Sequence, residues 1–269
     1  MTNPDNTSGS QRLNLEKMPG HWLLARMGKR VLRPGGRELT NDLLSELGIG
    51  PGDYVVDLAP GMGATAKLIL RHHPAGYTGI ERDEIAAARV NDLDDNFRYR
   101  CVVATAQNTG LSDNSAHVVV GEAFLTMHSE EDKQKILHEA FRILRPGGRL
   151  GIHELSLRPA SLDPETQKQV RGDLTRAVHV GARPLTSTDW QALIKRAGFK
   201  IRYESDAAMR LLEPTRLIKD EGLPRALKIV FNILRTPVAR RRIRAMRGIF
   251  RKHSDHMGAI AIIADKPKS

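Results

Sequence analysis

The stretch Val55-Val56-Asp57-Leu58-Ala59-Pro60-Gly61-Met62-Gly63 carries the strongest local signal in this 269-residue chain. Its first residues are typical of a buried strand with one acidic side chain, and the residues that follow are small or flexible. Glycine permits backbone conformations and close approaches that a side chain would block. A helix that starts directly after such a loop favours anionic groups at its N-terminus. The stretch therefore predicts a strand, loop and helix that together contact a bound cofactor.

Strand-like and helix-like segments alternate on both sides of this loop. We expect strands at 54–60, 77–81, 100–106, 116–124, 149–157, 199–205 and 257–265, and helices at 39–47, 64–71, 83–93, 130–144, 163–180 and 186–198. Such alternation predicts an α/β fold in which a mostly parallel sheet is covered by helices on both faces. We expect a Rossmann-like sheet of seven strands, with a helical insertion before the last strand.

The hexapeptide LRPGGR occurs twice, at residues 32–37 and 144–149. The flanking sequences differ, so the two copies do not indicate an internal repeat. We expect the second copy to be a helix-to-strand turn, because proline stops a helix and two glycines can reverse the chain. The first copy precedes the helix that leads into the cofactor loop, and it is the copy that we expect near a ligand.

Glu81 ends the expected strand that follows the loop, 18 residues after Gly63. An acid at this position can accept hydrogen bonds from two ribose hydroxyl groups. Nicotinamide dehydrogenases usually carry a GxGxxG loop, whereas here the pattern is Asp-x-Ala-x-Gly-x-Gly and no convincing Tyr/Lys pair for hydride transfer stands out. The acid in the loop's own strand suits a cofactor with an ammonium group, which points to S-adenosylmethionine.

The ordered segments VVDLAPGMGAT, GIERDE, ATAQNTGLSDNSAHVVVGEAFLTM and ILRPGGRLGIHEL resemble the class I S-adenosylmethionine-dependent methyltransferases. The resemblance is to the small-molecule type, related to ubiquinone and sterol methyltransferases, and it covers roughly residues 35 to 205. It implies S-adenosylmethionine as cofactor and S-adenosylhomocysteine as product. It also implies twelve cofactor-binding residues: Gly35, Gly36, Asp57, Ala59, Gly61, Gly63, Glu81, Arg82, Thr105, Ala106, Gly121 and Glu122.

The resemblance also assigns a place to each of these residues. The loop residues and the Gly35-Gly36 pair would contact the methionine part, Glu81 the ribose, and Arg82, Thr105 and Ala106 the adenine, while Gly121 and Glu122 follow the fourth strand. Two departures from the family pattern concern the cofactor: Ala59 replaces the usual first glycine of the loop, and Thr105 replaces an aspartate that commonly bonds the adenine amino group.

Acidic and histidine side chains near the ends of the fourth and fifth strands are the candidates for catalysis. Open parallel sheets bind ligands at this edge, and a base is needed when the methyl acceptor is a hydroxyl group or an acidic carbon. Glu122 and His153 are the predicted catalytic or acceptor-holding residues, with His128 and Glu154 as further candidates. No metal site is predicted, because the histidines show little ligand-like pairing and the chain has a single cysteine.

The expected domain organisation is simple. Residues 1–15 are polar and predict a disordered tail, and residues 16–269 predict a single methyltransferase domain. Within it we expect an N-terminal helical lead-in or lid at 16–48, a lid helix at 160–182 and a basic helical insertion at 210–255. The sequence lacks a signal peptide and any run of 18 apolar residues, which predicts a cytoplasmic protein, peripheral to a membrane at most.

The basic insertion carries nearly all of the net charge of +11, since residues 215–253 contain twelve Lys or Arg side chains against two acids. Its first long helix is expected to carry an apolar stripe of Leu223, Leu227, Val230, Phe231 and Leu234. The helix that follows is expected to carry a second stripe of Ala239, Ile243, Met246 and Phe250. The arginines then form the solvated face of helices packed on the core, or they contact anionic lipid headgroups, an anionic acceptor or RNA phosphates. The low aromatic content disfavours nucleic acid.

The sequence therefore predicts a methyltransferase that acts on a small, apolar or amphipathic acceptor, without deciding between O-, C- and N-methylation. Two alternatives stay open: an RNA methyltransferase that uses the basic helices, and a non-catalytic protein that binds S-adenosylmethionine. The oligomeric state is also open, with a homodimer as one possibility.

Overall fold

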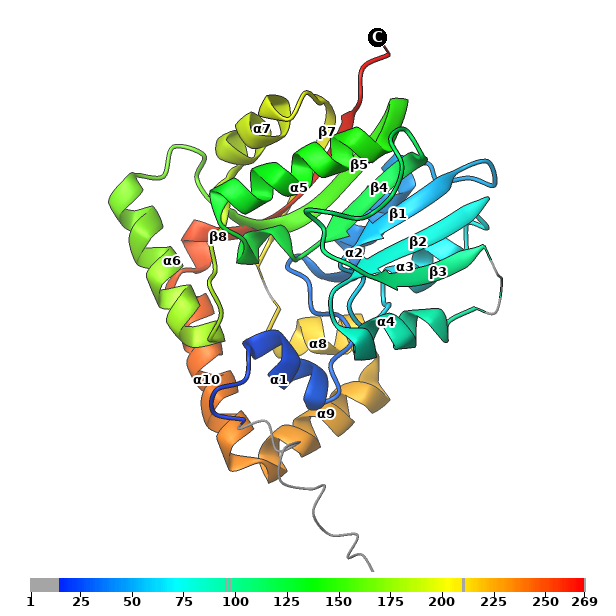
Figure 1. The fold of residues 1–269 in the computed structure, drawn as a ribbon. Coiled ribbons are helices and arrows are strands. Elements are labelled where there is room, and N and C mark those ends of the chain that lie inside the picture. The colour runs from blue at the N-terminus through cyan, green and yellow to red at the C-terminus, as the bar shows by residue number, and fades with distance from the viewer. Residues whose placement is uncertain (1–14, 95, 97, 210, 269) are drawn as a thin grey trace, which may run out of the picture.

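The computed structural model describes residues 15–94, 96, 98–209 and 211–268 (Figure 1). The expected disordered tail, apart from its last residue, lies outside the described residues. In the described part, an eight-stranded sheet runs through the centre of the molecule and has the order β3-β2-β1-β4-β5-β8-β7, with β6 paired to β5. The strands are β1 (Tyr54–Leu58), β2 (Gly76–Glu81), β3 (Tyr99–Val103), β4 (Ala116–Glu122), β5 (Leu144–Leu157), β6 (Leu185–Thr186), β7 (Lys200–Ala208) and β8 (Met257–Asp265).

The predicted fold class is confirmed. Strands β3, β2, β1, β4, β5 and β6 are parallel, and only β8 runs antiparallel, between β5 and β7. The continuous path has the expected seven strands, and the two-residue β6 is an addition at its side. The strand order reverses between β1 and β4, and the carboxyl ends of strands at such a reversal form a crevice that binds ligands.

Helices cover both faces of the sheet. The α-helices are α1 (Gly20–Arg26), α2 (Gly36–Leu47), α3 (Ala66–Leu70), α4 (Glu84–Asn91), α5 (Glu130–Ile143), α6 (Pro164–Val178), α7 (Ser187–Arg196), α8 (Pro214–Glu221), α9 (Leu223–Arg235) and α10 (Pro237–Lys252). Buried side chains of α5 and α7, such as Ile136 and Trp190, share one core with β1, β4 and β5. Leu43 and Ile69, from α2 and α3, belong to the core on the opposite face.

Local sequence explains where several of these helices begin. The side chains of Asp83, Ser129, Asp163 and Thr186 each accept a hydrogen bond from a backbone amide three residues later. Such caps satisfy amide groups that a helix leaves without a partner in its first turn. The proline after Asp163 adds a favourable first helical residue.

The second LRPGGR segment differs from its predicted form. Helix α5 ends at Ile143, but residues 144–149 belong to β5 and do not form a separate reversing turn. The β4–β5 register shifts between Ala116 and Val118, and Gly147 adopts a positive φ of 76°. Gly147 donates to Lys266 O and Gly148 accepts from Lys266 N, both at 2.9 Å. Pairing with the chain after β8 therefore keeps this segment extended.

The basic insertion forms α8, α9 and α10, which lie with α1 at one end of the molecule, away from α5 and α7 (Figure 1). Ala239 and Met246 of α10 are buried against α1, as the predicted second stripe requires. The first stripe, on α9, is exposed instead of packed on the core. Helical periodicity reveals an apolar face but not what covers it. Here the opposite side of α9 packs on Met27 and Gly28, directly after α1. None of the described helices has the length and apolar character needed to cross a membrane.

Candidate functional site

The loop after β1 has the strained geometry that the sequence predicted. Ala59, Gly61 and Gly63 all adopt positive φ angles, of 58°, 55° and 75°. A Cβ atom on Gly63 would lie 2.8 Å from Leu93 Cδ1, so this glycine allows α4 to pack closely. A Cβ on Gly61 would meet nothing nearer than 4.0 Å. Gly61 therefore supplies backbone freedom on an open side of the loop, which is where a ligand can approach.

Glu81 lies at the end of β2 beside this loop. Its Oε2 accepts from Gly61 N at 3.0 Å, and its Oε1 accepts from Asp83 N at 3.1 Å. A carboxylate offers about four acceptor positions, so each oxygen keeps one for a further donor. This arrangement fits the two adjacent hydroxyl groups of a ribose.

The residues predicted to border the adenine lie at the same edge of the sheet. Arg82 and Thr105 are exposed, and Val103 pairs in register with Glu81. Val103 and Ile85 of α4 are 53% and 71% exposed, although large apolar side chains are usually covered. These two residues were missed by sequence reasoning, and their exposure at this edge fits a flat apolar ring lying over them.

Asp57 is buried within the sheet. Tyr77 Oη donates to its Oδ2 at 2.9 Å. Burial raises the pKa of Asp57 to about 7, and the hydrogen bond from Tyr77 opposes this shift only in part. The carboxyl group is therefore poised to ionise near neutral pH when a cation approaches it.

Glu122, at the end of β4, is the centre of a buried polar network. Its Oε2 accepts hydrogen bonds from Arg33 Nη1 and Thr65 Oγ1, and its Oε1 accepts one from Thr40 Oγ1 at 2.6 Å. Burial would raise the pKa of Glu122, but the Arg33 guanidinium and the hydrogen bonds from His153 and Thr40 outweigh it and hold the pKa below its ordinary range. Glu122 is thus an anion with its acceptor positions filled, which makes it a weak proton acceptor.

His153, on β5, completes this network and is fully buried. Its Nδ1 lies 2.7 Å from Glu122 Oε1, and its Nε2 contacts the Pro34 carbonyl oxygen. Both ring nitrogens of this buried side chain therefore contact oxygen atoms. The first LRPGGR segment is therefore tied to the sheet through Arg33 and Pro34.

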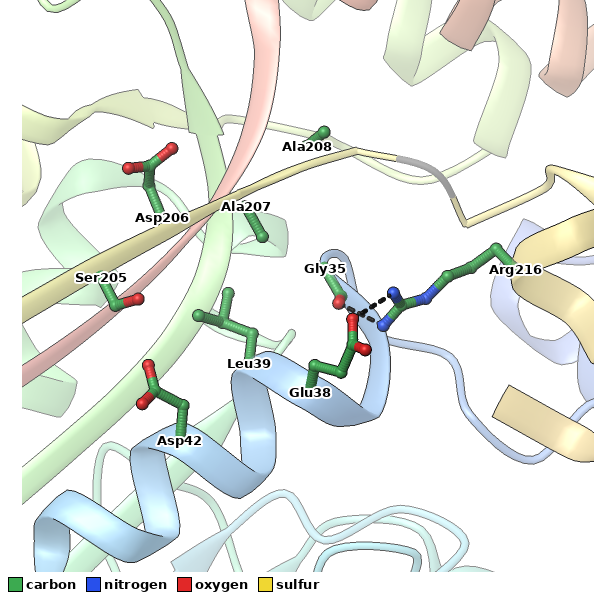
Figure 2. Close-up of a pocket in the computed structure, with 9 residues that line it drawn as sticks. All are labelled: Gly35, Glu38, Leu39, Asp42, Ser205, Asp206, Ala207, Ala208 and Arg216. Atoms are coloured by element: carbon green, nitrogen blue, oxygen red, sulfur yellow. Dashed lines mark hydrogen bonds and ion pairs between the residues drawn. The ribbon is translucent and has the colours of Figure 1, made fainter. Parts of the chain in front are cut away.

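The structure gives the predicted glycines Gly35 and Gly36 a packing role. A Cβ on Gly35 would lie 2.9 Å from Leu39 Cδ2, and a Cβ on Gly36 would overlap the Arg216 guanidinium. Figure 2 shows Arg216 reaching from α8 to the Gly35 carbonyl and to Glu38. These contacts line an open cleft of about 420 Å³ between α2 and β7. That cleft contains Gly35 but no other predicted cofactor residue, so contact of these glycines with the cofactor stays a prediction.

Gly121 also has a structural reason to be glycine, because a Cβ there would overlap the Phe124 ring.

Glu154 has a structural role as well, and its side chain is buried away from solvent. It accepts hydrogen bonds from the backbone amides of Phe124, Leu125 and Thr126 and from Thr126 Oγ1, at 2.7–3.1 Å. Burial nevertheless raises the pKa of Glu154. It holds the short 3-10 helix Leu125–Met127, and its acceptor positions are filled.

A cavity of about 110 Å³ lies next to the Glu122 and His153 network. It is bordered by Pro34 and Ala123, which adjoin that network, and its wall is mostly apolar. The wall comes from α1, α6 and α10, from the end of β5, from the 3-10 helix Leu125–Met127 and from loops. Its residues are Gly20, His21, Leu24, Leu32, Thr126, Met127, Glu154, Leu155, Leu174, Val178, Val180, Ala182, Met209, Leu211, Met246 and Phe250. The expected lead-in and lid helix thus both line it.

His21 of α1 is a wall residue that sequence reasoning missed. Burial lowers its pKa, and the charge of Arg82 lowers it further. The side chain is therefore a neutral imidazole at pH 7. A histidine in an apolar helical lead-in carries no sequence signal for this position, because only the tertiary fold brings α1 over the site.

In the described residues, no group of three or more His, Cys, Asp or Glu side chains is arranged to hold a metal ion.

Comparison with known proteins agrees with this geometry. A family model described as a methyltransferase domain matches residues 55–148. An uncharacterized protein of Haemophilus influenzae is 32% identical over 222 residues, which cover 80% of this chain and 86% of the relative. The 27-O-demethylrifamycin SV methyltransferase of Amycolatopsis mediterranei is 29% identical over 189 residues, and the match spans 66% of this chain and 65% of that enzyme.

A solved structure shares the fold over most of the chain. Phosphoethanolamine N-methyltransferase 2 of Haemonchus contortus, solved in complex with S-adenosyl-L-methionine, superposes with a TM-score of 0.68 at 16% identity. The match covers 92% of this chain and 57% of that one. The chain thus belongs to the class I S-adenosylmethionine-dependent methyltransferases, as its ordered motifs predicted.

Proposed function

We propose that this protein transfers a methyl group from S-adenosylmethionine to a small, apolar or amphipathic acceptor. The observation that carries the proposal is the apolar cavity beside the Glu122 and His153 network, at the carboxyl ends of β4 and β5. Acceptor and cofactor sites would then meet at the reversal in strand order.

The cofactor would be held by the residues around the first two strands. The open side of Gly61 and the two oxygens of Glu81 suit the ribose and its neighbouring atoms. Exposed apolar surface at Ile85 and Val103 suits the adenine. Asp57, with its pKa near 7, suits the ammonium group of the methionine part. When bound, the cofactor supplies a methyl group already activated by a positively charged sulfur.

The protein's own contribution is then alignment, exclusion of water and, for some acceptors, removal of a proton. Glu122 and His153, our predicted catalytic residues, support positioning: their hydrogen bonds hold Pro34, which lines the cavity, and its neighbour Arg33. Of the two titratable side chains in the cavity wall, Glu154 has its acceptor positions filled. His21 is the other, and as a neutral imidazole it is the candidate base for a hydroxyl or acidic-carbon acceptor.

The cavity volume of about 110 Å³ is smaller than the roughly 300 Å³ at the lower end of ligand pockets. An acceptor would therefore need α1, α6 or α10 to move before it can enter. These elements form the lid in this proposal, which agrees with the lead-in and lid helix expected from the sequence.

The cofactor site is tested by Glu81→Ala, with the exposed neighbour Glu84→Ala as matched control. Removing the Glu81 carboxylate removes charge-assisted hydrogen bonds, so we expect affinity for S-adenosylmethionine to fall about 10- to 100-fold in calorimetry. The control should bind like the unaltered protein. Equal binding by both variants would contradict the assignment of the ribose site.

The reaction is tested by incubating the protein with cofactor labelled in the methyl group and with separated lipid, small-metabolite and RNA extracts. We expect label in the lipid or small-metabolite fraction. Label in RNA would replace the proposed acceptor class. Saturable cofactor binding without transfer to any fraction would favour a non-catalytic binding protein.

A further inference from the structure

Helix α9 has an exposed apolar face. Six of the nine large hydrophobic side chains that are exposed in the described residues fall between 218 and 234: Ile218, Leu223, Leu227, Val230, Phe231 and Leu234. The last five lie on α9 within an arc of about 100° around the helix axis. Soluble monomers rarely expose such a contiguous patch unless it contacts a partner. We call the five side chains on α9 the α9 apolar face.

The opposite side of α9 fixes the helix to the protein. Ala226 and Ile229 are buried, and Ile229 packs on Gly28. Asn232 Nδ2 donates to Met27 O at 3.0 Å. The α9 apolar face is therefore preformed on a packed helix, and a ligand that covers it need not provide the free energy of helix formation.

Basic side chains without acidic partners lie along one edge of this face. Neither α9 nor α10 contains an Asp or Glu residue. Of the twelve basic side chains at 215–253, six form ion pairs with acids elsewhere, including Arg247 and Arg251 with Glu213, and Arg242 is buried against backbone carbonyls. The other five have no ion pair in the described part of the chain, and all lie on α9 or the first half of α10: Arg225, Lys228, Arg235, Arg240 and Arg244.

The arrangement on α9 combines both features. Lys228 and Arg235 lie at the edge of the arc of apolar side chains, and Arg235 stacks over the Phe231 ring at 5.2 Å. An apolar helical face with basic residues at its edge is the pattern of helices that lie in the interface of anionic membranes. We propose that α9 docks this protein on an anionic lipid surface, with the α9 apolar face inserted among acyl chains and Lys228 and Arg235 against the headgroups.

Charge favours a membrane over the other possible occupants. In a symmetric dimer through this face, two sets of unpaired cations would approach each other, and like charges at an interface cost free energy. Single-stranded RNA would require aromatic stacking platforms, and Phe231 is the one aromatic residue of α9. An anionic bilayer offers both the apolar layer and the negative charge.

The orientation agrees with the proposed acceptor class. Helices α1, α9 and α10 lie at the same end of the molecule (Figure 1), and α1 and α10 also line the apolar cavity. Docking through α9 would bring the lid to the lipid surface. This last step depends on the proposed function, whereas the docking itself does not.

The test measures sedimentation of the full chain with vesicles of phosphatidylcholine, with and without phosphatidylglycerol, and with no methyl transfer involved. We expect binding to the vesicles that contain phosphatidylglycerol. Leu227→Glu with Phe231→Glu should weaken it about tenfold or more, because two inserted apolar side chains are replaced by anions. Lys228→Glu with Arg235→Glu should also weaken it about tenfold or more.

The matched control is Lys195→Ala with Arg196→Ala, at exposed positions of α7. It lowers the net charge by two, as Leu227→Glu with Phe231→Glu does. It should change vesicle binding less than about twofold, because surface electrostatics decay within a Debye length. Binding of S-adenosylmethionine reports whether each variant is folded. If the Glu variant is not, the milder Leu227→Ser with Phe231→Ser replaces it, with an expected loss in the same direction.

Three results would overturn the proposal. One is equal vesicle binding by the α9 variants and the unaltered protein. Another is a stable dimer that the Leu227/Phe231 variant converts to monomers while the unaltered protein ignores vesicles, since a second copy would then cover the face. The third is retention of RNA that depends on Lys228 and Arg235 without any vesicle binding.

Discussion

Asp57 makes a quantitative prediction about stability and pH. Its pKa is 3.8 in an ordinary environment and about 7 in the folded protein, chiefly because of burial. A carboxyl group with a raised folded pKa holds its proton in the native state after the unfolded chain has released it. Its stabilising contribution is complete below pH 3.8 and is lost as pH rises to about 7. Each pH unit in this window costs about 1.4 kcal/mol.

The substitution Asp57→Asn removes this loss, because an amide does not ionise. Between about pH 5 and pH 8 the free energy of unfolding of the variant, relative to the unaltered protein, should rise by about 3 kcal/mol. Titrations of groups that do not interact with Asp57 cancel in this difference. Urea unfolding followed by the fluorescence of Trp22 and Trp190 measures it.

Tyr77→Phe is the companion variant. The hydrogen bond from Tyr77 lowers the pKa of Asp57, so its removal should raise that pKa further and extend the loss of stability above pH 7. A difference between Asp57→Asn and the unaltered protein that stays constant from about pH 5 to pH 8, within about 0.5 kcal/mol, would refute the reasoning. Asp57 would then be ionised throughout this pH range in the folded protein.

Two further predictions concern packing and charge near the site. Gly121→Ala should lower the free energy of unfolding by about 1–3 kcal/mol, because its Cβ overlaps the Phe124 ring. The control is Gly248→Ala in α10, which has no atom within 4 Å of its Cβ and should stabilise the protein slightly. The midpoints of urea unfolding compare the two variants. An unchanged midpoint for Gly121→Ala would contradict close packing of Phe124 on Gly121. Arg33→Met and Glu122→Gln should each cost about 3–5 kcal/mol, since each removes one partner of a buried ion pair, and the double variant should cost clearly less than the sum. Additive costs in this double-mutant cycle would show that the pair is not coupled.

Local signals were sufficient for most of the fold. A parallel sheet was predicted from the loop after β1, from Glu81 at the end of β2 and from the alternation of strand-like and helix-like hydrophobic periodicity. Each of these features depends on residues close together in the chain. The same locality explains the helix starts at Asp83 and Ser129, where the capping side chain and its amide are three residues apart.

The polar centre of the site could not be predicted in the same way. Glu122 and His153 were candidates, but their partners Arg33 and Pro34 come from a segment 89 and 119 residues away. Sequence reasoning placed Gly35 and Gly36 near the ligand, and the structure adds that the residues just before them reach the network, Arg33 through its side chain and Pro34 through its carbonyl oxygen. Which residue of a turn faces inward depends on backbone angles that its composition does not specify.

The chain order of the strand, loop and helix motifs between about residues 35 and 205 was enough to predict the fold and the family, since strand periodicity and glycine geometry act over a few residues. Tertiary packing alone decided which apolar stripe of the basic insertion is buried. Both stripes have the same 3.6-residue period, but α10 packs its stripe on α1, while α9 packs its other side on Met27 and Gly28 and leaves Leu227 and Phe231 exposed. A periodic pattern identifies an apolar face, and only the neighbouring elements determine whether protein covers it.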